Sequence, residues 1–342
     1  MEADKDLLVE VKDLKTHFFM NQGVVKAVDG VNLAIKRGGT LGIVGESGCG
    51  KSVTARSILR IVEHPGRIVD GEVLFYRQLG NGETEVLNLA AMDERGDEMR
   101  SIRGQEISMI FQEPMSSLSP FYTVGNQIAE ILLLHQEALS KEAARDRTIE
   151  LLRQVGIPRP ELRIDDYPFQ LSGGMCQRCI IAMAIACNPS MLIADEPTTA
   201  LDVTTQAQIL KLMEDMQLKL GMAIMLITHD LGVIAEMADD VAVMYLGRVV
   251  EKASVDDMFH DARHPYTKAL LRSIPKVSGG GRERLNSIRG MVPDPFNRPT
   301  GSGFGPRCDE FVPGTCEGCE PSLAEVAPGH FVSCCAIVES RG

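Results

Sequence analysis

The feature that most constrains this chain of 342 residues is a glycine-rich turn between an apolar run and a helical pattern. The turn, residues 45–52, reads GESGCGKS and follows the apolar residues 40–44. Glycines in such a turn let backbone N–H groups point toward one centre, and the positive end of the following helix adds to their field. The pattern therefore predicts a phosphate-binding loop on an α/β fold. The candidate residues for binding the phosphate-bearing ligand are Gly45, Ser47, Gly48, Cys49, Gly50, Lys51, Ser52 and Val53.

A pair of carboxylates follows a second apolar run, since residues 191–194 are followed by Asp195 and Glu196. Ligands of α/β proteins bind at the carboxyl ends of strands. Within the loop, Lys51 would reach the β- and γ-phosphates and Ser52 would bind Mg²⁺. Asp195 would suit the outer shell of Mg²⁺, and Glu196 would orient or deprotonate the attacking water. On its own, an apolar run that ends in Asp-Glu more often leads into a solvated loop.

The order of apolar patterns predicts an α/β core, over residues 5–270, with a helical insert at about 116–188. A glycine break at 278–281 and a proline-rich stretch predict a loop-rich extension over residues 271–342. Strands are expected within residues 7–35 and at 40–44, 191–194 and 223–227, and helices at 51–61, 124–135, 141–155, after Ser172 and at 204–220.

Composition narrows the class of partner. The chain has 35 Lys and Arg against 47 Asp and Glu, and this net charge of −12 argues against nucleic acid as a partner. The longest apolar run, residues 179–187, is less than half of what a bilayer crossing needs. The N-terminus carries no recognisable secretory signal, so we expect the chain in the cytoplasm, where cysteines are mostly reduced.

A third motif, Leu-Ser-Gly-Gly at residues 171–174, precedes a predicted helix. Ser172 can cap that helix, and the two glycines expose N–H groups. Ser172 lies 121 residues after Lys51 and 23 residues before Asp195. This order and spacing resemble the ATP-binding cassette (ABC) ATPases of ABC transporters. Their hallmark is a Leu-Ser-Gly-Gly stretch with a glutamine shortly after it, which is Gln177 here.

The resemblance implies further residues of an ATP site. Gln112 looks like the Q-loop glutamine, a catalytic residue and Mg²⁺ ligand that reports the γ-phosphate to the helical insert. Asp202 looks like the D-loop aspartate and His229 like the switch histidine. Phe18 or Phe19 would stack on adenine, and the sequence does not choose between them. Each residue has an ordinary alternative, such as a loop glutamine, a histidine at a strand end or a core phenylalanine.

The same resemblance implies a P-loop ABC-type domain with an antiparallel β subdomain, and a head-to-tail pair of such domains. ATP would lie between the phosphate loop of one subunit and the residues of the partner that correspond to Ser172, Gly173 and Gly174, with Gln177 also counted as nucleotide-binding. Donors from both subunits would then complete the charge cage only when ATP bridges the pair.

Four longer stretches are similar to the oligopeptide/dipeptide importer ATPases of bacteria. Such importers comprise two different ATPases, two transmembrane permease subunits and an extracytoplasmic substrate-binding protein. The chain would be one ATPase, peripheral on the cytoplasmic face of the inner membrane. Glutathione, nickel or oligosaccharides are alternative cargoes, and a soluble ABC ATPase without a transport role is a further alternative. The stretches are residues 46–53, 111–118, 194–202 and 264–271.

Five of the nine cysteines lie in the last 35 residues. Close relatives carry four tail cysteines that can hold a 4Fe–4S cluster, and thiolates suit such a site. This chain departs from their pattern at Ser302, where relatives often have a cysteine. The Cys-x-x-Cys spacing also fits zinc, and reduced thiols without a ligand are the third interpretation. The candidate ligands are Cys308, Cys316, Cys319, Cys334 and Cys335.

Overall fold

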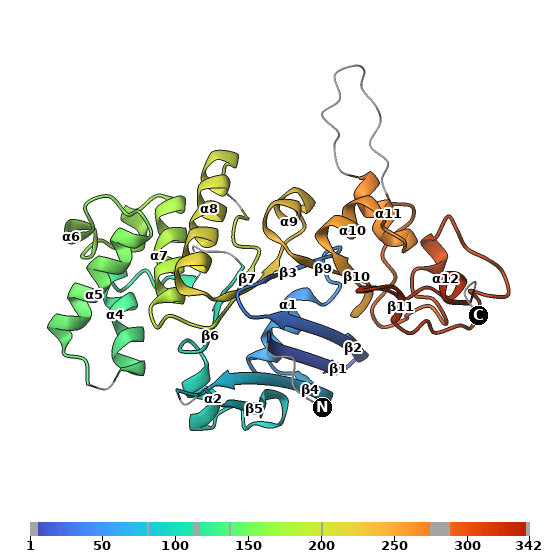
Figure 1. Ribbon diagram of the computed structural model, residues 1–342, viewed down its shortest axis with the longest axis horizontal. Coiled ribbons are helices and arrows are strands. Elements are labelled where there is room, and N and C mark those ends of the chain that lie inside the picture. The colour runs from blue at the N-terminus through green and yellow to red at the C-terminus, as the bar shows by residue number, and fades with distance from the viewer. Residues whose placement is uncertain are drawn as a thin grey trace, which may run out of the picture. The chain divides into compact units, whose positions relative to one another are not determined.

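The structure is a computed structural model that describes residues 6–80, 82–112, 117–136, 138–199, 201–273 and 288–339. The chain divides into two compact units. Unit 1 comprises residues 1–8, 35–40 and 91–227, and unit 2 comprises residues 9–34, 41–90 and 228–342. Figure 1 shows the helices and strands and labels most of them. Within the described residues, no helix combines the length and the apolar content that a bilayer crossing requires.

Unit 2 contains most of an antiparallel sheet of order β2-β1-β4-β5. Val9 of β1 lies opposite Phe75 of β4, and both are buried. The hydroxyl groups of Thr16 and Ser57 share a buried hydrogen bond of 2.8 Å, which joins β1 to helix α1 (Lys51–Ile58). The four strands are β1 (Leu7–Met20), β2 (Gly23–Lys36), β4 (Gly66–Gln78) and β5 (Thr84–Asn88).

A second group of strands in unit 2 leads to the phosphate loop. Strand β3 (Thr40–Val44) is buried throughout and pairs in parallel with β9 (Asp240–Tyr245). Strand β10 (Arg248–Ser254) pairs antiparallel with β9, and β12 (His330–Val332) and β11 (Ala324–Ala327) follow it in the sheet. The short helices of this part are α9 (Leu231–Met237), α10 (Val255–His260), α11 (Pro265–Arg272), η3 (Gly305–Arg307) and α12 (Cys335–Glu339).

A buried carboxylate joins the C-terminal strands to the rest of unit 2. Glu251 of β10 is 0% exposed. It accepts hydrogen bonds from Nε2 of His330 at 2.7 Å, from the backbone N–H of Arg263 at 2.7 Å and from that of His264 at 3.0 Å. A buried charge is costly unless donors surround it. Glu251 therefore fixes both β12 and the residues that begin α11.

Unit 1 contains three parallel strands and the long helices. The strands β6 (Ile107–Ile110), β7 (Met191–Asp195) and β8 (Ala223–Ile227) lie in that order. Because parallel strands end at the same edge, residues that follow β6 and β7 gather there. In Figure 1, α4, α5 and α6 cluster away from these strands. The helices of unit 1 are α2 (Asp97–Ile102), α4 (Val124–His135), α5 (Lys141–Gln154), α6 (Pro160–Arg163), η2 (Pro168–Gln170), α7 (Gly173–Ile185) and α8 (Val203–Leu220). The short helix η1 (Leu89–Ala91) lies mostly in unit 2.

The predicted α/β fold class with an antiparallel sheet is confirmed. Helix α4 has the predicted bounds, residues 124–135. Helix α5 begins at the predicted residue 141 and ends at residue 154, one residue earlier than predicted. The predicted strands do not include β4, β5, β6, β9, β10, β11 or β12. In β5 no residue is fully buried and the alternation is weak, which leaves little signal in the sequence. The predicted break at 278–281 and part of the stretch 111–118 lie outside the described residues.

Candidate nucleotide-binding site

The phosphate loop has a backbone that only glycine allows at two of its turns. Gly45 has φ 152° and Gly50 has φ 105°. A Cβ atom on Gly45 would lie 2.2 Å from the carbonyl oxygen of Met244, and one on Gly50 would lie 2.3 Å from that of Ala27. No side chain fits at such distances, so the neighbouring backbone itself shapes the loop.

Lys51 lies inside this loop and is only 7% exposed. Its Nζ donates hydrogen bonds to the carbonyl oxygens of Gly45 at 2.7 Å and Glu46 at 3.1 Å. Cys49 packs beside it and is 4% exposed, and burial raises the pKa of its thiol. Cys49 therefore fills the loop as an apolar, protonated side chain, while Lys51 is the cation available to a phosphate.

Unit 2 also brings the predicted switch histidine to the start of the loop. A cavity of about 390 Å³ is lined by Gly45 and Glu46 on one side and by His229 and the first turn of α9 on another. Asp230 caps α9, since its Oδ1 accepts from the backbone N–H of Gly232 at 2.8 Å. The cap fixes Asp230, the residue next to His229, and His229 lines the cavity beside the phosphate loop.

Unit 1 holds the predicted catalytic carboxylate in a small polar cluster. Asp195 ends β7 and is 2% exposed. Nε2 of Gln112 donates to Oε2 of Glu196 at 3.2 Å, and Oγ1 of Thr199 donates to the same oxygen at 2.9 Å. Glu196 has φ 49°, a conformation uncommon for residues other than glycine and often found at functional sites. The structure thus brings Gln112 and Glu196 together.

The Leu-Ser-Gly-Gly motif starts a helix in unit 1. Ser172 caps α7, because its hydroxyl accepts from the backbone N–H of Met175 at 3.3 Å. Ser172 and Gly173 are exposed. A Cβ atom on Gly174 would lie 2.7 Å from Cγ2 of Thr205, whereas one on Gly173 would meet its nearest atom at 4.0 Å. The motif therefore presents a helix start on the surface of the described chain.

Two predicted nucleotide contacts have other partners within unit 1. Gln177 is 0% exposed, and its Nε2 donates to the carbonyl oxygen of Pro197 at 2.6 Å. Asp202 caps α8 by accepting from the backbone N–H of Thr205 at 3.0 Å and from its hydroxyl at 2.7 Å. These hydrogen bonds lower the pKa of Asp202. Gln177 thus links the motif helix to the loop after β7, and Asp202 acts as a helix cap.

The two candidate adenine-stacking residues lie near the end of β1 in unit 2. Phe18 packs closely on Gly66, where a Cβ atom would lie 2.7 Å from its ring. Phe19 is 39% exposed, and the guanidinium of Arg67 lies 4.2 Å from its ring centre. One face of Phe19 is therefore already covered by a cation.

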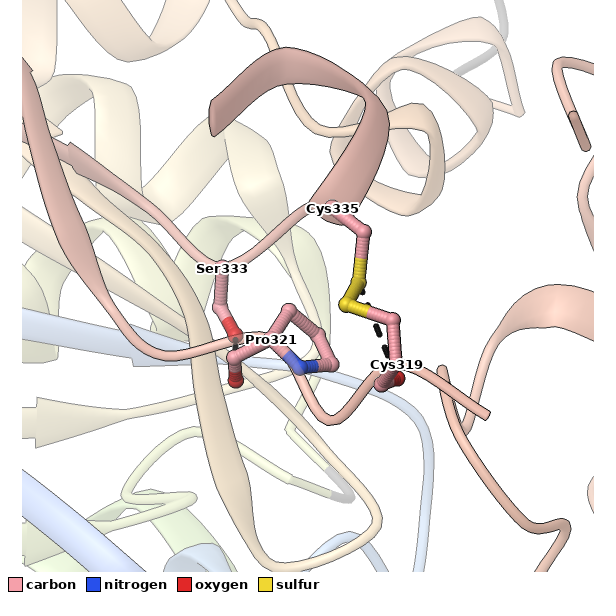
Figure 2. The surroundings of a disulfide bond; sticks show 4 residues. All are labelled: Cys319, Pro321, Ser333 and Cys335. Atoms are coloured by element: carbon pink, nitrogen blue, oxygen red, sulfur yellow. Dashed lines mark hydrogen bonds between the residues drawn. A yellow bond between two sulfur atoms is a disulfide. The ribbon is translucent and has the colours of Figure 1, made fainter. Parts of the chain in front are cut away.

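The tail cysteines are arranged differently from a ligand set. Cys319 and Cys335 form a disulfide, shown in Figure 2 beside the hydrogen bond from the Ser333 hydroxyl to the Pro321 carbonyl oxygen. Among the described residues, no three His, Cys, Asp or Glu side chains form a metal-binding group. The free thiols of the tail are those of Cys308, Cys316 and Cys334.

Sequence reasoning missed two residues that contact the phosphate loop. The hydroxyl of Tyr266 accepts a hydrogen bond from the backbone N–H of Glu46 at 2.9 Å, and Arg307 forms an ion pair with the Glu46 side chain. These partners lie 220 and 261 residues away along the chain. The only sequence signals are their positions in the stretch 264–271 and next to Cys308.

The sequence matches the ABC transporter family over residues 28–199 and the oligopeptide/dipeptide transporter C-terminal region over residues 250–316. The chain therefore belongs to the ABC transporter family, and it is an ATPase of that family. A dimeric post-hydrolysis state of the cassette MJ0796, bound to ADP and Pi, has a similar fold, with a TM-score of 0.62 and 29% identity. That match covers 72% of this chain and 99% of the other.

The curated proteins to which this chain is similar are named as ATP-binding proteins of peptide transport. A probable peptide ABC transporter ATP-binding protein of Sinorhizobium fredii is 50% identical, over 96% of this chain and 95% of its own. The oligopeptide transport protein OppD of Bacillus subtilis is 50% identical, over 95% of this chain and 87% of its own. The dipeptide transport protein DppD of Escherichia coli is 47% identical, over 96% of each chain.

Proposed function

We propose that the chain is the ATP-hydrolysing subunit of a bacterial importer for di- or oligopeptides. The observation that carries this proposal is the match of residues 250–316 to the oligopeptide/dipeptide transporter C-terminal region. The named peptide, oligopeptide and dipeptide relatives extend that similarity along nearly the whole chain.

In this proposal the phosphate loop binds the triphosphate. Its N–H groups and Lys51 would provide the positive field, Ser52 would bind Mg²⁺ through its hydroxyl, and Asp195 would lie in the outer shell of the ion. Bound Mg²⁺ would neutralise charge that develops on the phosphate oxygens. Glu196 accepts the proton of the attacking water, because it is the carboxylate that Gln112 and Thr199 hold in a fixed orientation.

Coupling to transport needs partners on two surfaces. The exposed Ser172 and Gly173 would meet the nucleotide of a second ATPase subunit, in a heterodimer. A groove of about 770 Å³ in the helical insert would receive a cytoplasmic helix of one of two permease subunits, and an extracytoplasmic protein would deliver the peptide. Aromatic Tyr122 and apolar Leu134 line the groove beside charged Arg145, which suits an amphipathic helix. The chain would then lie peripherally on the cytoplasmic face of the inner membrane.

The test is reconstitution of the chain with its permeases, partner ATPase and binding protein in lipid vesicles. We expect ATP turnover that di- or tripeptides stimulate and that Glu196→Gln reduces on the order of 100-fold or more, as loss of a general base does. Stimulation by nickel, glutathione or oligosaccharides instead of peptides would contradict the cargo. Undiminished turnover in Glu196→Gln would contradict the role of that residue.

A 4Fe–4S cluster on the cysteines of residues 308–335 remains a prediction, and the arrangement of these cysteines does not support it. A 4Fe–4S cluster needs four ligands, and the disulfide leaves Cys308, Cys316 and Cys334 as free candidates. Iron, acid-labile sulfide and zinc assays on anaerobically purified chain would decide, since stoichiometric iron and sulfide would require Cys319 and Cys335 to be reduced.

A further inference from the structure

The second residue of the phosphate loop is bound by an arginine from the C-terminal extension. Nη1 of Arg307 donates to Oε2 of Glu46 at 2.6 Å, and Nη2 donates to Oε1 at 2.9 Å. The side chain of Arg307 is 4% exposed and that of Glu46 is 25% exposed. This is a bidentate, largely buried pair, the geometry in which charge-assisted hydrogen bonds are strongest and most directional.

The guanidinium of Arg307 is held on its other sides as well. Its Nε donates to the carbonyl oxygen of Arg289 at 3.0 Å, and its Nη1 lies 3.4 Å from the hydroxyl of Tyr245. The rings of Tyr245 and Phe304 lie 5.8 and 6.0 Å from its central carbon. These contacts hold the planar guanidinium of Arg307 in one position, and the guanidinium in turn fixes the carboxylate of Glu46.

Glu46 in turn contacts the lysine of the loop. Its carbonyl oxygen accepts from Nζ of Lys51 at 3.1 Å and from the backbone N–H of Cys49 at 3.3 Å. Its backbone N–H donates to the hydroxyl of Tyr266, which is fully buried in α11. Tyr266 thus holds the main chain of Glu46 while Arg307 holds its side chain. A shift of Glu46 would move the first turn of the loop and an oxygen that orients the Lys51 ammonium.

We propose that Arg307 is a positioning residue for the phosphate loop, which acts through Glu46 and makes ATP affinity depend on the folded C-terminal extension. The inference rests on the proposed ATP site. Arg307 does not touch the nucleotide in this proposal; it fixes the residue that begins the turn in which Lys51 lies. The alternative is an ion pair that only attaches the extension.

The experiment measures the dissociation constant of MgATP for the full chain by titration calorimetry, below the melting temperature of every variant. Arg307→Met should raise it at least about tenfold, the size expected when a buried pair loses one partner. Arg307→Lys keeps the charge without the fork, and should restore part of the affinity. Adding Glu46→Gln to Arg307→Met should change affinity less than about twofold further, because the two residues act as one unit.

Lys268→Met is the matched control, since Nζ of Lys268 binds Glu310 of the extension at 3.2 Å through an exposed pair without touching the loop. Equal affinities of Arg307→Met and Lys268→Met would overturn the proposal, and so would fully additive losses in the double variant. If Arg307→Met lacks a cooperative melting transition, Arg307→Lys and Glu46→Gln decide by the same criteria. Failure of the parent chain to bind ATP, or unchanged binding by Lys51→Ala, would instead refute the ATP site itself.

Discussion

Two turns of this chain each place backbone N–H groups at the start of a helix, yet they are held in different ways. In the phosphate loop, neighbouring backbone lies so close to Gly45 and Gly50 that no side chain fits, and Lys51 is almost buried. At the Leu-Ser-Gly-Gly turn, Ser172 provides a single cap and Gly173 is open. In the proposed function, the turn that would bind the triphosphate is fixed by its own chain, whereas the turn that would meet a partner is left exposed.

The largest expected effect comes from Gly45→Ala. Its Cβ atom would overlap the Met244 carbonyl oxygen, so the loop must move, and ATP turnover should fall on the order of 100-fold. Gly48→Ala is the comparison, since nothing lies within 4 Å of its Cβ position and only its φ of 77° opposes the change. It should lose much less turnover. Equal losses would show that backbone conformation, and not the close neighbours, fixes the loop.

The second test weakens the hydrogen bonds that hold the start of α11 near the phosphate loop. Glu251→Gln replaces one oxygen by an N–H₂ group that faces backbone donors at the start of α11, the helix whose Tyr266 holds Glu46. The free energy of unfolding should fall by about 3 kcal/mol in urea titrations. Glu310→Gln breaks only an exposed pair and should change it by less than about 1 kcal/mol. Similar losses in the two variants would contradict this assignment.

The third test uses pH. His264 caps α11 and is fully buried, and burial lowers its pKa from 6.5 to about 3. It is therefore neutral in the folded chain, while the unfolded chain takes up its proton as the pH falls below about 6.5. Stability should drop by about 2 kcal/mol between pH 7 and pH 5 from this group. His264→Asn replaces the capping Nδ1, which accepts from the backbone N–H of Tyr266 at 3.1 Å, by an amide oxygen that can accept the same bond. It should remove that share of the pH dependence, and an unchanged slope would contradict the assignment.

The smallest effect is expected at the exposed turn. Ser172→Ala and Ser140→Ala each remove one helix cap, and each should cost about 1 kcal/mol of stability. Only Ser172→Ala should also reduce ATP turnover of the assembled transporter, because Ser140 lies at the start of α5. Equal turnover in both variants would mean that the Leu-Ser-Gly-Gly turn does not meet a partner's nucleotide.

Sequence reasoning succeeds where a few adjacent residues determine the outcome. The glycine spacing of residues 45–52 predicts the loop, and Ser172, predicted as a helix cap, does cap α7. Sequence reasoning fails where a side chain binds a partner that is not adjacent in the sequence. Gln177 turns inward to Pro197, and the pairing of Cys319 with Cys335 cannot be read from spacing alone.

The position of β12 beside β10 has a practical consequence. Residues 251 and 252 of β10 find their backbone partners in Val332 and Phe331. If the last two dozen residues were removed, β10 would become an open edge strand with unpaired N–H and C=O groups, and Glu251 would lose His330. Open edges recruit strands from other molecules. Removing residues from the C-terminal end of this protein would thus promote its aggregation.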